Sequence, residues 1–425
     1  MSGGSYYRRN LSNRVMSALR TVLSVLKLVA VLLLFFVSIE LMGDSFKLMG
    51  KGVVDTLLTM TTNPFVGLFI GVLTTSLVQS SSTVTTMTVT LVASGGLTIS
   101  GAIPIVMGAN IGTSVTNTMV SLGHVTRKDE FSRAIAGATV HDFFNLLSVL
   151  ILFPMEISFQ LISRIAAVLT EGLQGVGGTK LLSPLKELVD PVVDVIIHLF
   201  QSNGFMVLLA GLALLFLSLR FLVKILKGAV LSRSEEYLHK YIFSSVTVSL
   251  LFGVLLTVLV QSSSITTSIT VPLVAAGLLR VDQIFPFVLG ANIGTTITSL
   301  LAALAFAAGG TLEGIAALKV AFAHLSFNML GTALFLPIRF LRNIPIRLAE
   351  ALGRLAVVNR FYALGYLLTV FFVIPILVIV LTSRFDIEYT PVVPESLKEL
   401  VESDTPVDST SMQDSLAVLP PSTSE

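Results

Sequence analysis

A long stretch without charged side chains limits what this chain can fold into. No Asp, Glu, Lys or Arg occurs from Thr56 to Thr126. Over the whole chain, charged residues make up 12% and hydrophobic residues 53%, whereas a soluble domain usually carries about 25% charged residues. We therefore expect an all-α polytopic membrane protein, located in the cell (inner or plasma) membrane. Its length allows roughly eight to ten elements of about 20 apolar residues each.

The remaining composition excludes several classes of site. The chain has no cysteine, which excludes disulfides, thiolate metal sites and cysteine nucleophiles. The net charge of +2 is not concentrated into a basic docking face, so we expect no nucleic-acid partner. The apolar run Thr21–Met42 follows a basic N-terminus and is too long for a signal-peptide core. We expect it to be the first membrane span.

The chain contains two similar halves. The segment GVLTTSLVQSSSTVTT from Gly71 matches GVLLTVLVQSSSITTS from Gly253, and IPIVMGANIGTSVTN from Ile103 matches FPFVLGANIGTTITS from Phe285 at the same separation. With a separation one residue longer, His141 and Asn145 of VHDFFN match His324 and Asn328. A constant separation over about 80 residues indicates an internal duplication.

The charges predict that the two halves are inverted in the membrane. As one straight helix, Pro64–Ser94 would be about 46 Å long, too long for a ~30 Å hydrocarbon core. A re-entrant hairpin with its tip at QSSS places Arg127, Lys128 and Arg133 inside, as the positive-inside rule prefers. The same tracing brings the second hairpin, Tyr241–Leu279, in from the opposite face. Inverted-topology repeats of this kind are typical of secondary transporters.

This tracing divides the chain into seven parts. They are a cytoplasmic N-terminus (1–20), a first span and outer link (21–63), inverted repeat 1 (64–155), an outer loop with connecting span and inner link (156–240), inverted repeat 2 (241–340), an inner link and last span (341–382), and a disordered acidic tail (383–425). We expect this tail to emerge outside, because only one apolar span, Ala363–Leu381, follows the inner arginines.

Each QSSS tip combines groups that suit an oxyanion. A helix break in a bilayer exposes backbone groups, and the N–H groups that start the next half-helix carry the positive end of its dipole. The alternative is that these hydroxyls only bond the preceding turn or pack helices, but their recurrence beside a fixed Gln favours a site. The candidate substrate-binding residues are Gln79, Ser80, Ser81, Ser82, Gln261, Ser262, Ser263 and Ser264.

No Arg or Lys adjoins either tip, so a bound anion would need co-bound cations. Oxygen-rich groups with little charge suit a weakly held hard cation such as sodium. The GANIGT segments supply such groups if their glycines allow an unwound backbone; a simple glycine kink is the alternative. Asp142 is an acid inside a span, and either a cation ligand or a structural Asp–His pair. The candidate sodium ligands are Asn110, Thr113, Asp142, Asn145, Asn292, Thr295 and Thr298.

The paired QSSS and GANIGT segments, together with RAIAGATVHDFFNLLSVLILFP, closely resemble the type II sodium-dependent phosphate cotransporters. The resemblance covers Pro64–Met155 and Ser245–Arg339. It implies that the QSSS tips bind phosphate and sodium, that Asp142 marks an electrogenic member, and that Asn145 is a neighbouring cation ligand. His124 and Arg127 depart from the animal pattern, so one sodium site would be built differently. The short outer loop without cysteine resembles bacterial members.

The function that we expect is sodium-coupled import of inorganic phosphate by alternating access, with sodium as co-substrate and no cofactor. The first alternative is a sodium-coupled carrier of another tetrahedral oxyanion. A passive anion channel is a second alternative, disfavoured by inverted repeats around one closed site. An enzyme is not expected, because no second carboxylate or Ser–His–Asp arrangement can be placed near Asp142. The partners are phosphate, sodium and the lipid bilayer; the oligomeric state is left open.

Overall fold

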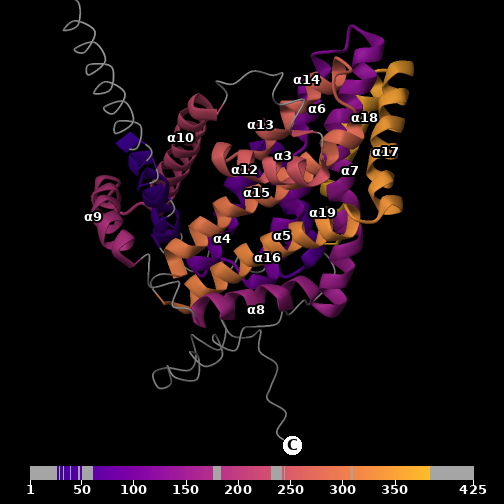
Figure 1. Cartoon of the computed structure of the whole chain (residues 1–425). Coiled ribbons are helices and arrows are strands. Elements are labelled where there is room, and N and C mark those ends of the chain that lie inside the picture. The colour runs from indigo at the N-terminus through magenta and orange to yellow at the C-terminus, as the bar shows by residue number, and fades with distance from the viewer. Residues whose placement is uncertain are drawn as a thin grey trace, which may run out of the picture.

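The computed structural model describes residues 26–45 and 48–49 (apart from positions 28, 32 and 39), 61–175, 183–230, 242–307 (apart from 244) and 310–382. Every described element is a helix (Figure 1). The helices are α3 (Pro64–Val78), α4 (Ser81–Ala93), α5 (Ile99–Gly112), α6 (Val115–Leu122), α7 (Lys128–Phe159), α8 (Leu161–Gly175), α9 (Ser183–Leu199), α10 (Gly204–Val230), α12 (Val246–Val260), α13 (Ser263–Ser268), α14 (Thr270–Ala275), α15 (Val281–Ala307), α16 (Leu312–Phe335), α17 (Arg339–Val358), α18 (Phe361–Leu368), the π-helix η3 (Thr369–Val373) and α19 (Ile374–Thr382).

Several helices have the length and composition of membrane spans, as the sequence predicts. Among the described residues, five segments are long and apolar enough to cross a bilayer. They are Ile99–Leu122, Lys128–Phe159, Val281–Ala307, Leu312–Phe335 and Phe361–Thr382. By contrast α3 and α12, which lead into the QSSS tips, have 15 residues each. At 1.5 Å per residue each is about 22 Å long, too short to cross alone.

The two halves repeat the same close helix crossing. In the first half α3 packs on α5, and in the second α12 packs on α15. A Cβ atom on Gly71 would overlap the carbonyl oxygen of Ile105, and one on Gly253 would overlap that of Phe287. Likewise, a Cβ atom on Gly108 would overlap the carbonyl oxygen of Leu68, and one on Gly290 would overlap that of Leu250. The duplicated glycines therefore let two backbones touch, once in each half.

The second part of each hairpin packs against the other half. Helix α4 contacts α15 and α16, whereas α14 contacts α7 and α13 contacts α6. Arg133 of α7 donates from Nε to the carbonyl of Ala275 at the end of α14, at 2.9 Å. The largest apolar core accordingly contains side chains from both halves, such as Val106 and Val320. The halves are interlocked rather than placed side by side.

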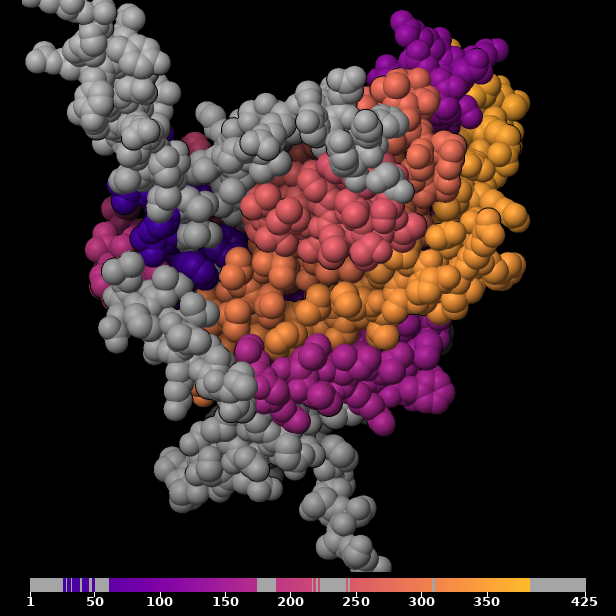
Figure 2. All heavy atoms as spheres, in the orientation of Figure 1, coloured from indigo at the N-terminus to yellow at the C-terminus, as the bar shows by residue number. Residues whose placement is uncertain are grey.

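Helices outside the repeated segments surround this centre. Helix α17 lies along α7 at one edge, and α8 contacts α16 at the lower end of the view (Figure 1). Figure 2 shows α8 extended across the lower face, beneath α15 and α16. The segment that was expected to be an outer loop thus contains two amphipathic helices, α8 and α9. The N-terminus and the acidic tail, with its expected outer location, lie outside the described residues.

One expectation about the helices is wrong. In the first half α5 ends at Gly112 and α6 starts at Val115. Thr113 and Ser114 between them keep right-handed helical dihedral angles, so the helix is loosened after the GANIGT glycines and not unwound at them as expected. The second GANIGT segment lies inside α15, which runs without a break from Val281 to Ala307. The identical letters therefore differ by a short irregularity in the first half. A glycine permits an unwound backbone but does not require one, and packing decides which form is taken.

Candidate functional site

Both QSSS tips turn at their glutamine. Gln79 has φ 56° and Gln261 has φ 54°, the left-handed conformation that non-glycine residues seldom adopt. This single residue ends the first helix of each hairpin, and the following serine begins the next helix. The break is therefore shorter than the four residues that the sequence suggested, since Ser81 and Ser82 are already helical. A strained residue at the same place in both halves points to a functional constraint.

The first serine of each tip caps the helix that follows. Ser80 Oγ accepts from the backbone N–H of Thr83 at 3.2 Å, and Ser262 Oγ accepts from that of Ile265 at 3.3 Å. These caps satisfy one N–H group and leave the earlier N–H groups of the first turn without an intrahelical partner. Each tip therefore presents backbone donors at the positive end of a helix, the arrangement that binds anions elsewhere.

The next serines of the tips keep their hydroxyls available. Ser81, Ser82 and Ser263 are buried, and within the described part of the chain their side chains make no hydrogen bond. Ser264 instead reaches into the first half, where its Oγ donates to the carbonyl of Thr113 at 3.3 Å. That carbonyl lies at the interruption between α5 and α6. The second tip thus lies directly against the broken GANIGT segment.

A continuous chain of buried amide and imidazole groups joins the halves at the centre. His324 Nε2 lies 3.4 Å from Asn110 Oδ1, and Asn145 Nδ2 donates to the Asn110 carbonyl at 2.7 Å. Asn292 Nδ2 donates to Asn145 Oδ1 at 2.7 Å, and Asn292 Oδ1 lies 2.5 Å from His141 Nε2. Each histidine therefore pairs with the GANIGT asparagine of the opposite half. The sequence placed these asparagines and Asn145 among sodium ligands, and the structure brings all three together.

The glutamines of the two tips have different partners. Thr298 Oγ1 donates to Gln261 Oε1, and Gln261 Nε2 donates to the carbonyl of Val258 at 2.6 Å. Gln79 is exposed and lies 3.8 Å from the sulfur of Met119. Thr116, which corresponds to Thr298, has a buried Oγ1 without a hydrogen-bond partner in the described residues. The second tip is thus bonded through its glutamine oxygen to a threonine, whereas the first tip contacts α6 through the weaker acceptor sulfur of Met119.

The threonines of the two GANIGT segments lie close to their own helix backbones. Thr113 Oγ1 donates to the carbonyl of Ala109 at 3.1 Å, and Thr295 Oγ1 donates to that of Ala291 at 3.0 Å. Both residues are buried. Their oxygens retain lone pairs that could accept or ligate, because each hydroxyl uses only its hydrogen in these bonds. This geometry is therefore compatible with the expected role of both threonines as sodium ligands.

Asp142 is fully buried in α7, but it is not part of this central chain. Its Oδ2 accepts from the hydroxyl of Tyr366 at 3.3 Å, and its Oδ1 has no hydrogen-bond partner in the described part of the chain. His141 bonds to Asn292 and not to Asp142. The alternative of a structural Asp–His pair is therefore wrong. An unpaired oxygen of a buried acid costs several kcal/mol unless a cation or proton occupies the site.

The donor set suits a hard, weakly bound cation and not a transition metal. Within the described residues, no group of three or more His, Cys, Asp or Glu side chains could hold a metal ion. The available ligands are carbonyl, amide and hydroxyl oxygens together with the carboxylate of Asp142. Such oxygens bind hard cations, whereas zinc and copper prefer nitrogen and sulfur. Sodium as a co-substrate is compatible with this chemistry.

Sequence reasoning missed three buried features of the helix bundle. Tyr366 lies in the last span, outside both repeats, and no motif marks it. Asn117 Nδ2 donates to Thr267 Oγ1 at 2.8 Å, a link between the halves that requires the packing of α6 on α13. Lys319 is a fully buried cation in α16 whose Nζ has no hydrogen-bond partner in the described residues, although Glu156 and Glu171 act on it electrostatically. Only Lys319 could have been noticed, as a charge within an apolar stretch.

Comparison with known proteins decides which family this arrangement represents. The sequence model described as "Na+/Pi-cotransporter" matches residues 34–177 and 214–366. The chain belongs to the Na+/Pi-cotransporter family. The match includes both QSSS tips, both GANIGT segments and the last-span residue Tyr366. The resemblance that the sequence motifs indicated is therefore confirmed.

Mammalian members of this Na+/Pi-cotransporter family are similar to the chain over most of its length. It is 32% identical to sodium-dependent phosphate transport protein 2B of Homo sapiens, over 89% of this chain and 68% of that protein. It is 34% identical to sodium-dependent phosphate transport protein 2A of Ovis aries, over 84% of this chain and 67% of that protein. No solved structure matches the chain. These relatives are transporters, and the chain is accordingly a transporter rather than an enzyme.

Proposed function

We propose that this chain is a sodium-coupled symporter that imports inorganic phosphate across the cell membrane. The observation that carries the proposal is the pair of tips, each with a free helix N-terminus and uncommitted serine hydroxyls. A tetrahedral oxyanion between them could accept hydrogen bonds from backbone N–H and serine O–H donors. The names of the mammalian relatives, which specify sodium-dependent phosphate transport, support phosphate over sulfate or arsenate.

Sodium would supply the positive charge that the tips lack. Neither tip nor the central chain of asparagines and histidines contains Arg or Lys. A phosphate dianion in such surroundings is unstable without counter-charge. We place sodium near Asn110, Asn145 and Asn292, and a further sodium at Asp142. Because Asp142 has no acidic counterpart in the second half, this further sodium makes transport electrogenic in our proposal.

Alternating access is supported by the difference between the two halves. If they are related by an inverted two-fold axis, the reciprocal pairs His141–Asn292 and His324–Asn110 follow directly from that symmetry. The symmetry fails at the GANIGT helices, where one is interrupted and the other is continuous. We infer that the halves exchange these two arrangements during transport, so that the site opens first to one face and then to the other.

The proposal is tested by uptake of radiolabelled phosphate into proteoliposomes. An inward sodium gradient should drive uptake at least about tenfold above that in choline or potassium buffer, and excess unlabelled phosphate should compete better than sulfate or arsenate. Equal uptake without sodium would indicate a passive channel. If another oxyanion competed more strongly than phosphate, that oxyanion would be the substrate.

Exchange between the halves has a separate test, because the chain contains no cysteine. Cysteine can be introduced singly at the corresponding positions Thr116 and Thr298, and labelled with a membrane-impermeant thiol reagent. Addition of sodium and phosphate should change the labelling rates of Thr116→Cys and Thr298→Cys in opposite directions. A parallel change at both positions would contradict the proposed exchange.

A further inference from the structure

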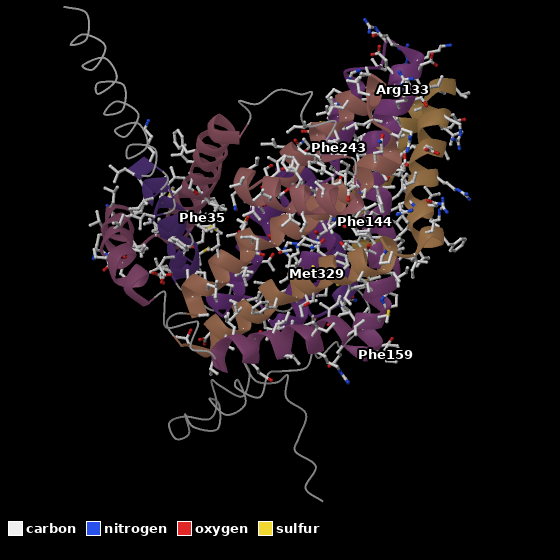
Figure 3. All side chains as sticks on the ribbon, viewed as in Figure 1. Phe35, Arg133, Phe144, Phe159, Phe243 and Met329 are labelled. Atoms are coloured by element: carbon white, nitrogen blue, oxygen red, sulfur yellow. The ribbon has the colours of Figure 1, made fainter. Side chains whose placement is uncertain are left out.

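A polar cavity lies at the start of α12, remote from the QSSS tips. It measures about 350 Å³, within the range of about 300–1,000 Å³ usual for ligand sites. Charged side chains line much of it, namely Arg280, Asp282, Arg339 and Arg342. Phe243, labelled in Figure 3, marks its wall. The cavity lies where α12 begins, and the tip lies where α12 ends, about 22 Å away along the helix.

The charge of this cavity is strongly unbalanced. Three arginines line it, against one carboxylate, that of Asp282. Arg280 holds that carboxylate in a two-point contact, with Nε–Oδ1 and Nη2–Oδ2 distances of 2.9 Å. Arg339 and Arg342 have no carboxylate within 4.0 Å among the described residues, although Arg342 is near enough to Asp282 to interact electrostatically. Within the described part of the chain, two positive charges therefore remain without a direct carboxylate partner.

The helix ends around the cavity add to this positive potential. Helices α12, α15 and α17 all begin at its wall, with Val246, Val281 and Arg339 as their first residues. Neither α12 nor α17 has a side-chain cap or an acidic residue in its first turn. Arginine at the start of α17 opposes the helix dipole, an arrangement that destabilises a helix unless an anion lies nearby. Long helices with free N-terminal N–H groups are suited to receive one.

We propose that this cavity is a second anion site, which binds the phosphate group of a ligand between Arg339, Arg342 and the start of α17. Arginine pairs with phosphate oxygens through two parallel N–H donors, and Ser245, Gln283 and Asn343 add neutral hydrogen-bonding groups at the rim. The ligand is a phosphate carried either by an anionic lipid headgroup or by free inorganic phosphate. This site differs in kind from the tips, because its fixed positive charge makes sodium unnecessary.

Binding measurements without sodium separate this site from the transport site. Purified protein in choline buffer would be tested in two arms. One arm measures binding of radiolabelled inorganic phosphate, and the other counts bound phosphatidylglycerol against phosphatidylcholine by native mass spectrometry. The test variant is Arg339→Gln/Arg342→Gln. The matched control is Arg354→Gln, an exposed arginine of the same helix that does not line the cavity. Circular dichroism would verify that the variants remain folded.

We expect the double variant to lose at least about tenfold in affinity in one arm, since it removes both charged donors to the phosphate group. The control should retain wild-type binding. Loss confined to the lipid arm identifies a lipid headgroup, and loss confined to the phosphate arm identifies free phosphate. A Ser81→Ala/Ser263→Ala variant should keep this binding even where sodium-driven uptake fails. Wild-type binding of both ligands by the double variant, or no sodium-independent binding at all, would overturn the proposal.

Discussion

His141 and Asn292 lie 151 residues apart in the chain, yet the imidazole Nε2 and the amide Oδ1 approach within 2.5 Å in the protein interior. Asn292 in turn donates to Asn145, so one asparagine connects two side chains of the opposite half. Removal of one partner leaves a buried polar group unsatisfied, which costs about 1–3 kcal/mol. The pair therefore connects the two halves, and its asparagine is one of the candidate sodium ligands.

We predict that His141→Ala and Asn292→Ala each destabilise the folded protein by about 1–3 kcal/mol. The double variant should be less destabilised than the sum of the single variants, with a coupling energy of about 0.5–3 kcal/mol. Thermal unfolding in detergent would be measured for the wild type, the two single variants and the double variant. Additive effects of the two substitutions would show that the contact contributes nothing to stability.

Ser81→Ala and Ser263→Ala should each lower sodium-driven phosphate uptake by at least about tenfold, because each removes a hydroxyl donor to the proposed anion. The amount of folded protein should not change, since neither hydroxyl makes a hydrogen bond in the described structure. Ser76→Ala is the matched control. Ser76 lies in the same hairpin, and its hydroxyl donates to the carbonyl of Val72 at 2.7 Å. Near-normal uptake by either tip variant would assign that serine to packing alone.

Asp142→Gly should reduce the charge moved per phosphate while some uptake persists, because it removes one proposed sodium ligand. Tyr366→Phe should leave that charge unchanged. The Tyr366 hydroxyl competes with sodium for the carboxylate, so its loss should lower the half-saturating sodium concentration about fivefold, equivalent to roughly 1 kcal/mol. Simultaneous current and tracer recordings provide both quantities. Unchanged charge per phosphate in Asp142→Gly would leave Asp142 a structural role only.

Gly71→Ala and Gly253→Ala should each prevent accumulation of folded protein, with a loss of stability above about 3 kcal/mol. The added Cβ would overlap the backbone of Ile105 or Phe287, and backbone cannot yield as a flexible side chain can. Gly172→Ala in α8 is the control, because nothing lies within 4 Å of the place that its new methyl group would take. Expression and gel filtration measure the outcome. A normal elution profile for Gly71→Ala would mean that α3 and α5 separate readily.

Much of the architecture could be predicted from the sequence, because duplication made weak signals stronger. A single QSSS run is ambiguous, but its recurrence beside GANIGT identified the helix breaks at Gln79 and Gln261. Sequence could not show that the second GANIGT helix is continuous, because identical local residues leave the choice to tertiary packing. Nor could it pair His141 with Asn292, since that contact depends on how two distant helices meet.

The contact between Asp142 and Tyr366 makes the two halves unequal. Position 325, which corresponds to Asp142, is a leucine, so the second half offers no carboxylate at the equivalent place. The phenol that bonds Asp142 comes from α18, near the end of the described chain. Two identical halves would present the same residue at both places. This acid–phenol pair therefore requires the halves to differ in sequence, and duplication alone cannot produce it.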